Sequence, residues 1–474
     1  MAAINDKKEI FERMPVPKAI ASMAIPTIVS QLINLIYNMA DAIYIGQTGD
    51  SIKIASITVV FTIFMMTISF SNLFGVGGGS LMARLIGAGR EEDAKKVCAF
   101  SIYGALTIAL LYSLLIGVFL DPVLRLLGAS DQSIVYAREY TILVIIVGNV
   151  PVILSMTVAH LLRNAGYSKQ ASFGLSGGGV LNILLDPLFM FVILPQGREV
   201  CGAALATLLS NTASCVYLLL TLRRVSKTAP LSLRFRDAAQ TGKTEIKSLF
   251  AVGIPSAILT ALFDVANIFL NAIMSSSHGD LALAATGIVI KAERLPNAIN
   301  IGMCQGMLPI VAYNYSSGNH ERMHKVIKTV RIYGLVIAVA SIVLFEILAE
   351  PISRLFLNTS NGNAQEAKTT LAFAAVFLQI RCLAAIPQFL NYHTSFCMQA
   401  VGDGRDTLLH AVTRELVFYI PMMFLFNALF GRNGLVSALV VGETCGAIFA
   451  LILFSRWKKK NVISYAGNRK NSRK

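Results

Sequence analysis

The sequence predicts an all-α membrane protein in which twelve transmembrane helices form two six-helix lobes related by a parallel internal repeat. Hydrophobic residues make up 55% of the 474 residues and charged residues only 14%, against roughly 25% charged in an ordinary soluble domain. Apolar stretches of about 20 residues, the length that crosses a bilayer, recur along nearly the whole chain. The longest polar interval, 223–247, leaves an equal number of stretches on either side.

Short loops that carry Gly, Pro and charge separate the apolar stretches. In the first lobe the spans are expected near 21–45, 53–80, 95–120, 135–160, 170–195 and 201–223. In the second lobe they are expected near 248–275, 282–312, 327–349, 369–396, 407–430 and 435–456. The first stretch follows a mixed-charge segment without a signal-peptide cleavage pattern, so it is expected to remain as a helix. The 7 cysteines show no C-x-x-C spacing, which predicts packing residues rather than disulfides or metal ligands.

The two lobes carry matching residues at a nearly constant offset. Ile25-Pro26 recurs as Ile254-Pro255, Gly49-Asp50 as Gly279-Asp280, and Gly202 as Gly434. An even number of crossings gives both copies the same orientation, so they are expected to be related by an axis along the membrane normal, with a substrate cavity between them. The predicted division is an N-terminal lobe at 1–222, a basic cytoplasmic linker at 223–247, and a C-terminal lobe with a basic tail at 248–474.

The net charge of +15 is distributed as in a membrane protein. Most of the 41 Lys and Arg residues fall in loops on the side of both termini. This is the positive-inside pattern, and it predicts that both termini face the cytoplasm. A basic surface beside anionic lipid accounts for the charge, so no nucleic-acid partner is expected.

Two acids of the first lobe, Asp41 and Asp186, are predicted at membrane depth, where an ionised group is costly. No Lys or Arg is predicted inside the six first-lobe spans to neutralise them. A proton or a bound cation is therefore expected there. The alternative is that Asp41 reaches water at the outer end of its helix and Asp186 is a satisfied packing residue.

Polar neighbours favour the site interpretation. On the first helix a polar stripe falls within about 80° at 100° per residue, and its members are Gln31, Asn34, Asn38 and Asp41, flanked by Tyr37. On the fifth helix Asn182 and Asp186 are spaced i, i+4 and share a face, with Gly178 leaving room for a neighbouring helix. Such oxygen-rich surroundings suit a proton or a hard cation such as Na⁺. Pro26 and Pro187 each remove a backbone hydrogen bond and permit a bend.

The second lobe balances its charges. Its predicted spans hold the acids Asp264, Glu293, Glu415 and Glu443 and the bases Lys291, Arg294, Arg381 and Arg414. Ion pairs between helices are a sufficient structural account of this set.

The sequence motifs that could indicate catalysis lack the structural context they need. The G-x-S-x-G match at 174–178 lies in an apolar helix with no preceding strand, and the histidines show no metal spacing. No enzyme activity and no structural metal are therefore expected.

Four runs resemble a known family, the multidrug and toxic compound extrusion (MATE) transporters. The run from Ile25 to Gly49 resembles that family's first helix, and 182–187 together with 202–207 resemble later segments. The run 305–315 resembles the branch that includes a staphylococcal exporter. The resemblance covers nearly the whole chain.

The resemblance implies a twelve-helix antiporter that exports lipophilic, often cationic compounds in exchange for Na⁺ or H⁺ by alternating access. Carried over by motif, the cation-coupling site comprises Asp41, Asn182, Asp186 and Thr207, and Asp264 is a possible second-lobe site. The substrate or cavity candidates are Gln31, Asn34, Tyr37 and Asn38. The partners implied are small molecules and the lipid bilayer, with the coupling ion in place of a cofactor. The protein is expected to act as a monomer in a bacterial or archaeal cytoplasmic membrane.

Two rival functions are open at this point. A lipid-linked precursor flippase of the same superfamily would need several basic residues converging on a pyrophosphate, and none is predicted within the first-lobe spans. A membrane-embedded enzyme would need a converging nucleophile, metal set or acid-base pair, and only the two aspartates come near that description.

Overall fold

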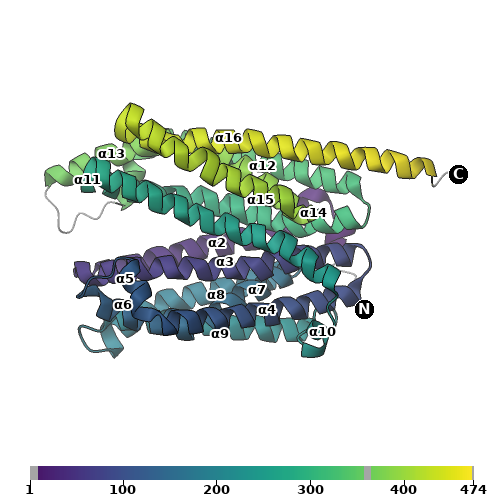
Figure 1. Cartoon of the computed structure of the whole chain (residues 1–474), viewed down its shortest axis with the longest axis horizontal. Helices are drawn as coiled ribbons and strands as arrows, with labels where there is room; N and C mark the ends of the chain where they lie inside the picture. Colours follow the sequence, from purple (N-terminus) through teal and green to yellow (C-terminus); the bar gives the residue numbers. More distant parts are fainter. Residues whose placement is uncertain (1–8, 357–363, 472–474) are drawn as a thin grey trace. The chain divides into compact units, whose positions relative to one another are not determined.

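The computed structural model describes residues 9–356 and 364–471, and within these ranges the regular structure is helical. Residues 1–8, 357–363 and 472–474 lie outside the described residues. Figure 1 labels the helices along the chain. The helices up to the linker are α2 (Val16–Gly46), α3 (Ser51–Gly87), α4 (Glu91–Val118), α5 (Leu120–Leu126), α6 (Ser133–Thr141), η1 (Ile142–Val147), α7 (Asn149–Asn164), α8 (Ser168–Pro187), η2 (Leu188–Ile193), α9 (Glu199–Val225) and α10 (Phe235–Ala239). The later helices are α11 (Lys243–Ser316), α12 (His320–Phe356), α13 (Ala364–Cys382), α14 (Ala385–Val401), α15 (Gly404–Val412), η3 (Thr413–Tyr419) and α16 (Ile420–Asn471).

Three of these elements, η1, η2 and η3, are π-helices that continue a neighbouring α-helix. In the described part of the chain, 8 helices are long and apolar enough to cross a membrane, and two bent pairs bring the number to 10. The pairs join α6 and η1 to α7, and α13 to α14, at bends of 47° and 49°.

Two long helices are broken by a glycine, which completes the set of twelve spans. A straight helix of the 74 residues of α11 would extend about 110 Å, far beyond the roughly 30 Å hydrocarbon core. Gly279 interrupts α11 with φ 79° and ψ −179°, and Gly431 interrupts α16 with φ 63° and ψ −145°. Only glycine adopts such backbone angles readily. The described residues therefore contain the twelve helices that the sequence predicts.

Backbone geometry supports the internal repeat. Gly49 has φ 65° and its predicted counterpart Gly279 has φ 79°. Gly89 and Gly318, which occupy equivalent positions in the two halves, have φ 74° and 78°. Equivalent turns between consecutive spans therefore use the same left-handed glycine conformation.

The chain forms two compact units, which differ from a simple division of the sequence. Unit 1 comprises Met1–Asp264, Ile301–Val330 and Gln399–Gly404, and unit 2 comprises Val265–Asn300, Arg331–Met398 and Arg405–Lys474, in each case for the described residues. Parts of α11 thus belong to unit 1. The lobe boundaries at 222 and 248 remain a prediction.

Unit 1 is built on helices that pack side by side. α2 packs on α8, α3 packs on α4 and α7, and α8 packs on α9 (Figure 1). As expected, Gly178 permits close approach: a Cβ there would lie 1.8 Å from Ser214 Oγ of α9. The tight contact between α8 and α9 brings their polar side chains together.

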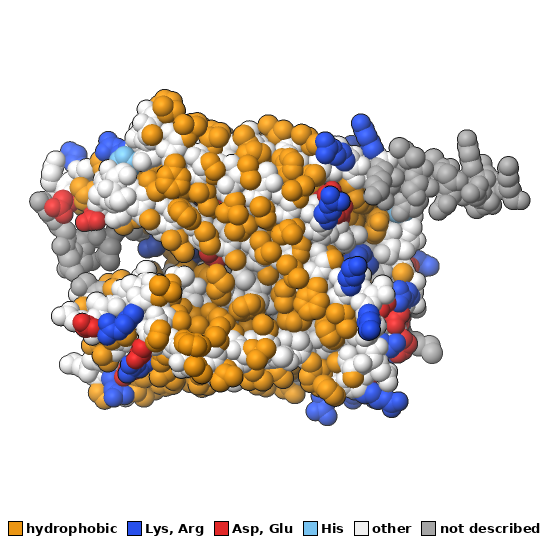
Figure 2. All heavy atoms as spheres, in the orientation of Figure 1, with side chains coloured by type: hydrophobic (Ala, Val, Ile, Leu, Met, Phe, Trp, Pro, Cys, Tyr) orange, Lys and Arg blue, Asp and Glu red, His pale blue; other side chains and the backbone are white. Residues whose placement is uncertain are grey.

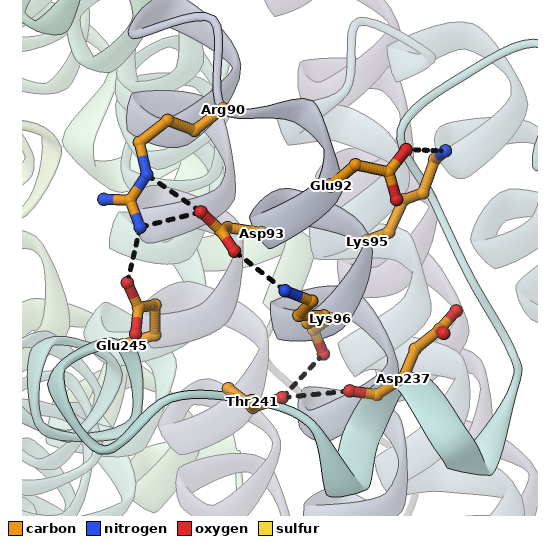
Figure 3. A network of polar contacts seen from close by, with 8 residues as sticks. All are labelled: Arg90, Glu92, Asp93, Lys95, Lys96, Asp237, Thr241 and Glu245. Carbon is orange, nitrogen blue, oxygen red and sulfur yellow. Dashed lines mark hydrogen bonds and ion pairs between the residues drawn. The ribbon is translucent and has the colours of Figure 1, made fainter.

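The linker is structured and joined to unit 1. Arg90 lies between α3 and α4, and its guanidinium contacts Asp93 and, at 2.7 Å, Glu245 at the start of α11 (Figure 3). The Thr241 hydroxyl donates to the Lys96 carbonyl oxygen at 3.1 Å. These contacts fix the polar interval 223–247 against the α3–α4 turn.

The lateral surface of the helices is apolar. Leu114, Leu220 and Ile347 are 64%, 60% and 72% exposed. On the face shown in Figure 2, hydrophobic side chains cover the lengths of the helices, and Lys and Arg gather toward their ends. An apolar surface of this extent suits contact with lipid rather than water.

Unit 2 has its own apolar core and buried ion pairs. Phe377, Met423 and Leu435 are among its fully buried side chains. Arg381 binds Glu293 through two bonds of 2.9 and 2.8 Å. These contacts confirm part of the ion pairing that the sequence predicts in this half.

The second buried ion pair of unit 2 involves η3. Arg414 binds Glu443 of α16 at 3.0 and 2.5 Å and lies 3.5 Å from Glu415. All three side chains are nearly inaccessible to solvent. The charge of Arg414 is therefore satisfied within the core of the unit.

Candidate functional site

The site is centred on α8, where Asn182 and Asp186 occupy successive turns of one face. The Asn182 Nδ2 group donates to Asp186 Oδ1 at 3.2 Å and to Thr207 Oγ1 of α9 at 3.4 Å. The three side chains are 0–6% exposed: Asp186 0%, Asn182 2% and Thr207 6%. The i, i+4 spacing thus produces the shared face that the sequence predicts.

Asp41 reaches this cluster from α2. The helices approach closely at Gly179, where a Cβ would lie 3.0 Å from Ile33 and 3.3 Å from Tyr37. The Asp41 carboxyl group lies in hydrogen-bond contact with that of Asp186. Two carboxyl groups can share a hydrogen bond only if one carries a proton, and otherwise a cation must lie between them.

Several oxygen atoms of the cluster have no hydrogen-bond donor. Asp41 Oδ1, Asn182 Oδ1 and Asp186 Oδ2 are buried without a partner in the described part of the chain. Buried acceptors are normally satisfied. Three unsatisfied oxygens that belong to one cluster fit a hard cation with oxygen ligands, or a proton on the carboxyl pair. The described residues hold no group of three or more His, Cys, Asp or Glu side chains suited to a metal.

Tyr140 belongs to the same cluster and was missed by sequence reasoning. It lies at the end of α6, and its hydroxyl group contacts Thr207 and lies within electrostatic range of Asp41 and Asp186. A single tyrosine in front of an apolar run carries no periodic signal. Only the packing of α6 on α9 reveals its position.

The helix geometry changes directly after the site. The π-helix η2 begins at Leu188, immediately after Asp186 and Pro187. Because proline has no N–H group, it interrupts the regular hydrogen-bond series, and π-helical turns occur frequently at functional sites. By contrast, α2 continues without interruption through Pro26.

The polar stripe of α2 extends away from the carboxyl pair. Asn38 Nδ2 donates to the Asn34 carbonyl oxygen at 2.6 Å, and Gln31 Nε2 donates to Gln305 Oε1 of α11 at 3.2 Å. The predicted cavity candidates on this stripe, including Tyr37, are half-buried. Their binding of substrate remains a prediction.

Asp264, the possible second-lobe site, lies on α11 at the end of the first segment of unit 1 and is half-buried. Its role also remains a prediction.

One expectation about charge requires correction. The prediction that the first six spans hold no basic residue is wrong, because the predicted spans begin at Lys53 and Lys95 and include Arg138, and because α3 and α7 continue beyond the predicted ends at 80 and 160. These extensions contain Arg84 and the buried Arg163, and Lys53 is buried at the start of α3. The apolar stretch of the sequence ends where polar residues begin, whereas the helix continues for as long as its backbone hydrogen bonds continue.

Lys53 does not neutralise the carboxyl pair. Its Nζ atom binds Glu199 at 2.8 Å and lies 3.7 Å from Asp50. Among the described residues, neither Asp41 nor Asp186 forms an ion pair with a basic side chain.

Twelve apolar helices with a repeated pattern and an acidic, oxygen-rich site inside the bundle define a polytopic membrane protein of the transporter class. The family model MatE matches the chain twice, at residues 26–188 and 255–425. The chain belongs to the MatE family. The two matches begin at Pro26 and Pro255, the positions that the sequence pairs as repeat equivalents.

Individual proteins are also similar to this chain. The multidrug export protein MepA of Staphylococcus aureus (strain MRSA252) is 29% identical over 94% of each chain. A crystal structure of MATE in complex with MaL6 has a TM-score of 0.88 at 23% identity and covers 96% of this chain and 99% of its own. A MOP superfamily transporter from Pyrococcus furiosus has a TM-score of 0.87 at 23% identity and covers 95% and 97%. Both solved structures have the same fold as this chain.

Proposed function

We propose that this protein is an antiporter that exports lipophilic, often cationic compounds by alternating access, driven by entry of Na⁺ or H⁺. The observation that carries the proposal is the buried contact between Asp41 and Asp186, which has no basic partner among the described residues. Such a pair requires a proton or a cation. The name of the relative MepA, a multidrug export protein, supports the class of cargo.

Coupling follows from the charge of the site. When the carboxyl pair is empty, its charge attracts a cation, and when it is loaded that charge is reduced. If ion and substrate favour different conformations by a few kcal/mol each, the ion gradient shifts the equilibrium toward release of the substrate outside. Asn182 and Thr207 would orient the carboxyl pair, and Asp264 is a candidate for a second residue that contributes to ion coupling.

We also propose the setting in which this transport occurs. The protein would work as a monomer in a bacterial or archaeal cytoplasmic membrane with both termini in the cytoplasm, as the basic loops favour. No catalysed reaction forms part of the proposal.

The lipid-linked flippase is the weaker alternative, although Arg84 of α3 and Arg163 of α7 lie in helices of unit 1. The two differ in their surroundings: Arg84 lies against Gly402, whereas Arg163 contacts His160 and Gln305. A pyrophosphate would require several basic groups that converge.

The test is transport by purified protein in vesicles under one imposed gradient at a time. Rhodamine 123 efflux should respond to a Na⁺ gradient or to a proton gradient and should stop when the matching ionophore collapses that gradient. Efflux at a rate that depends on neither gradient would exclude antiport.

A further inference from the structure

Arg163, near the end of α7, is a buried cation without an anionic partner. Its side chain is 3% exposed, and its Nε atom has no hydrogen-bond partner. In the part of the chain that the structure describes, no Asp or Glu pairs with it, and Arg381 and Arg414 show how this protein satisfies other buried guanidinium groups. A buried charge without a counter-charge is strongly destabilising.

Two neutral acceptors surround the guanidinium group. Nη1 lies 3.3 Å from Gln305 Oε1 and 3.5 Å from His160 Nδ1. Because a guanidinium only donates, both neighbouring atoms act as acceptors, and Nδ1 must be unprotonated. These contacts orient Arg163 and leave its positive charge uncompensated.

Helix packing holds Gln305 in this position. The second part of α11 approaches α2 closely, because a Cβ at Gly302 would lie 2.8 Å from Ile28 Cα and one at Gly306 would lie 2.6 Å from Ala24 Cα. Gln305 lies between these glycines. Its Oε1 atom therefore accepts from both Gln31 and Arg163.

The cluster is partly accessible. Gln31, His160 and Gln305 are half-buried, whereas Arg163 is buried. All four residues belong to unit 1. A carboxylate that enters beside Gln305 would meet a guanidinium donor whose Nε is free, and this is a strong, charge-assisted interaction.

We propose that Arg163, His160 and Gln305 form an anion-binding subsite for transported compounds, so that the cargo includes amphiphiles that carry a carboxylate. This inference rests on the proposed export function. The polar stripe on α2 places Gln31 about 15 Å along the helix from Asp41. A compound with a cationic and an acidic end would find a partner for each at opposite ends of the stripe.

Binding to purified protein in detergent, without any gradient, tests the subsite. Fluorescein and rhodamine 123 share a xanthene ring and differ in charge, since fluorescein is anionic and rhodamine 123 cationic at pH 8. Arg163→Gln should weaken fluorescein binding tenfold or more and leave rhodamine 123 binding within twofold. The matched control is Arg84→Gln, which removes another arginine of unit 1 and should change neither dye.

A second variant keeps the arginine and supplies the missing charge. Gln305→Glu places a carboxylate beside Arg163 and should abolish fluorescein binding while the melting temperature stays equal or rises. If Arg163→Gln does not fold, fluorescein binding by Gln305→Glu tests the subsite instead. Unchanged fluorescein binding by Gln305→Glu, equal losses of both dyes in Arg163→Gln, or no fluorescein binding by the wild type would each overturn the proposal.

The same proteins separate this proposal from the proposed function. If the protein exports rhodamine 123 along an ion gradient but never binds fluorescein, the subsite is refuted and the antiporter function is supported. If fluorescein binding depends on Arg163 but neither dye is exported along a gradient, the subsite is supported as a binding site and the antiporter function is refuted.

Discussion

Breaking the ion pair between Arg381 and Glu293 should cost this protein a large part of its stability. The two side chains are 6% and 13% exposed and are joined by two short bonds. Replacement of Arg381 by Met leaves the Glu293 carboxylate buried and unpaired, which typically costs about 3–5 kcal/mol. A folded domain has only about 5–15 kcal/mol of stability, so Arg381→Met should lose about a fifth of it or more.

The assay is the free energy of unfolding in mixed detergent micelles, with gradient-driven efflux measured per folded molecule. The double variant Arg381→Met with Glu293→Met removes both charges and should recover most of the loss, because the penalty comes from the unpaired carboxylate. The control is Arg354→Met in an exposed pair, 68% and 60% accessible, which should change stability by about 0–1 kcal/mol. A loss below 1 kcal/mol in the Arg381 variant, or normal abundance with abolished ion dependence, would refute the structural role.

Further predictions concern the turns, the topology and the site. Gly279→Ala should lower the free energy of unfolding by about 1–3 kcal/mol, because its φ of 79° and ψ of −179° strain any other residue. The control Gly177→Ala, in a helix with open space around its Cβ, should be neutral or slightly stabilising, and equal effects would contradict the backbone argument. A single cysteine at Lys227 should resist an impermeant reagent added to intact cells, whereas one at Gln196, at the opposite end of α9, should react; the reverse pattern would invert the topology. Thr207→Val removes the oxygen that accepts from Asn182 and should raise the half-saturating Na⁺ or H⁺ concentration severalfold in transport assays, and an unchanged value would remove Thr207 from the site.

Much of the fold could be predicted because lipid imposes a simple rule on the sequence. Every span had to be apolar over about 20 residues, and the helical structure, the number of spans and the repeat followed from that rule. The residues at which the helices end could not be predicted in the same way. Helical hydrogen bonding continues into polar sequence, so the apolar stretches leave Arg84 and Arg163 outside the predicted spans, whereas both residues lie in helices.

The candidate site was predictable to the extent that it follows helix periodicity. Asp41, Asn182 and Asp186 stand out because a polar group in an apolar helix needs a reason. Tyr140, Gln305 and the compact units depend on which helices pack together, and no spacing along the chain encodes such contacts between distant segments. The π-helix after Pro187 depends in the same way on how one missing N–H group is accommodated.

The most direct test of the account is ion-driven efflux by Asp41→Asn in reconstituted vesicles. The substitution keeps the size of the side chain and fixes its charge at zero, as in a permanently loaded site. We expect normal expression, retained binding of rhodamine 123 and retained exchange at equal ion concentrations, but no efflux driven by a Na⁺ or proton gradient, with Asp186→Asn behaving alike. Gradient-driven efflux at the wild-type rate by well-folded Asp41→Asn protein would contradict the account and direct attention to Asp264.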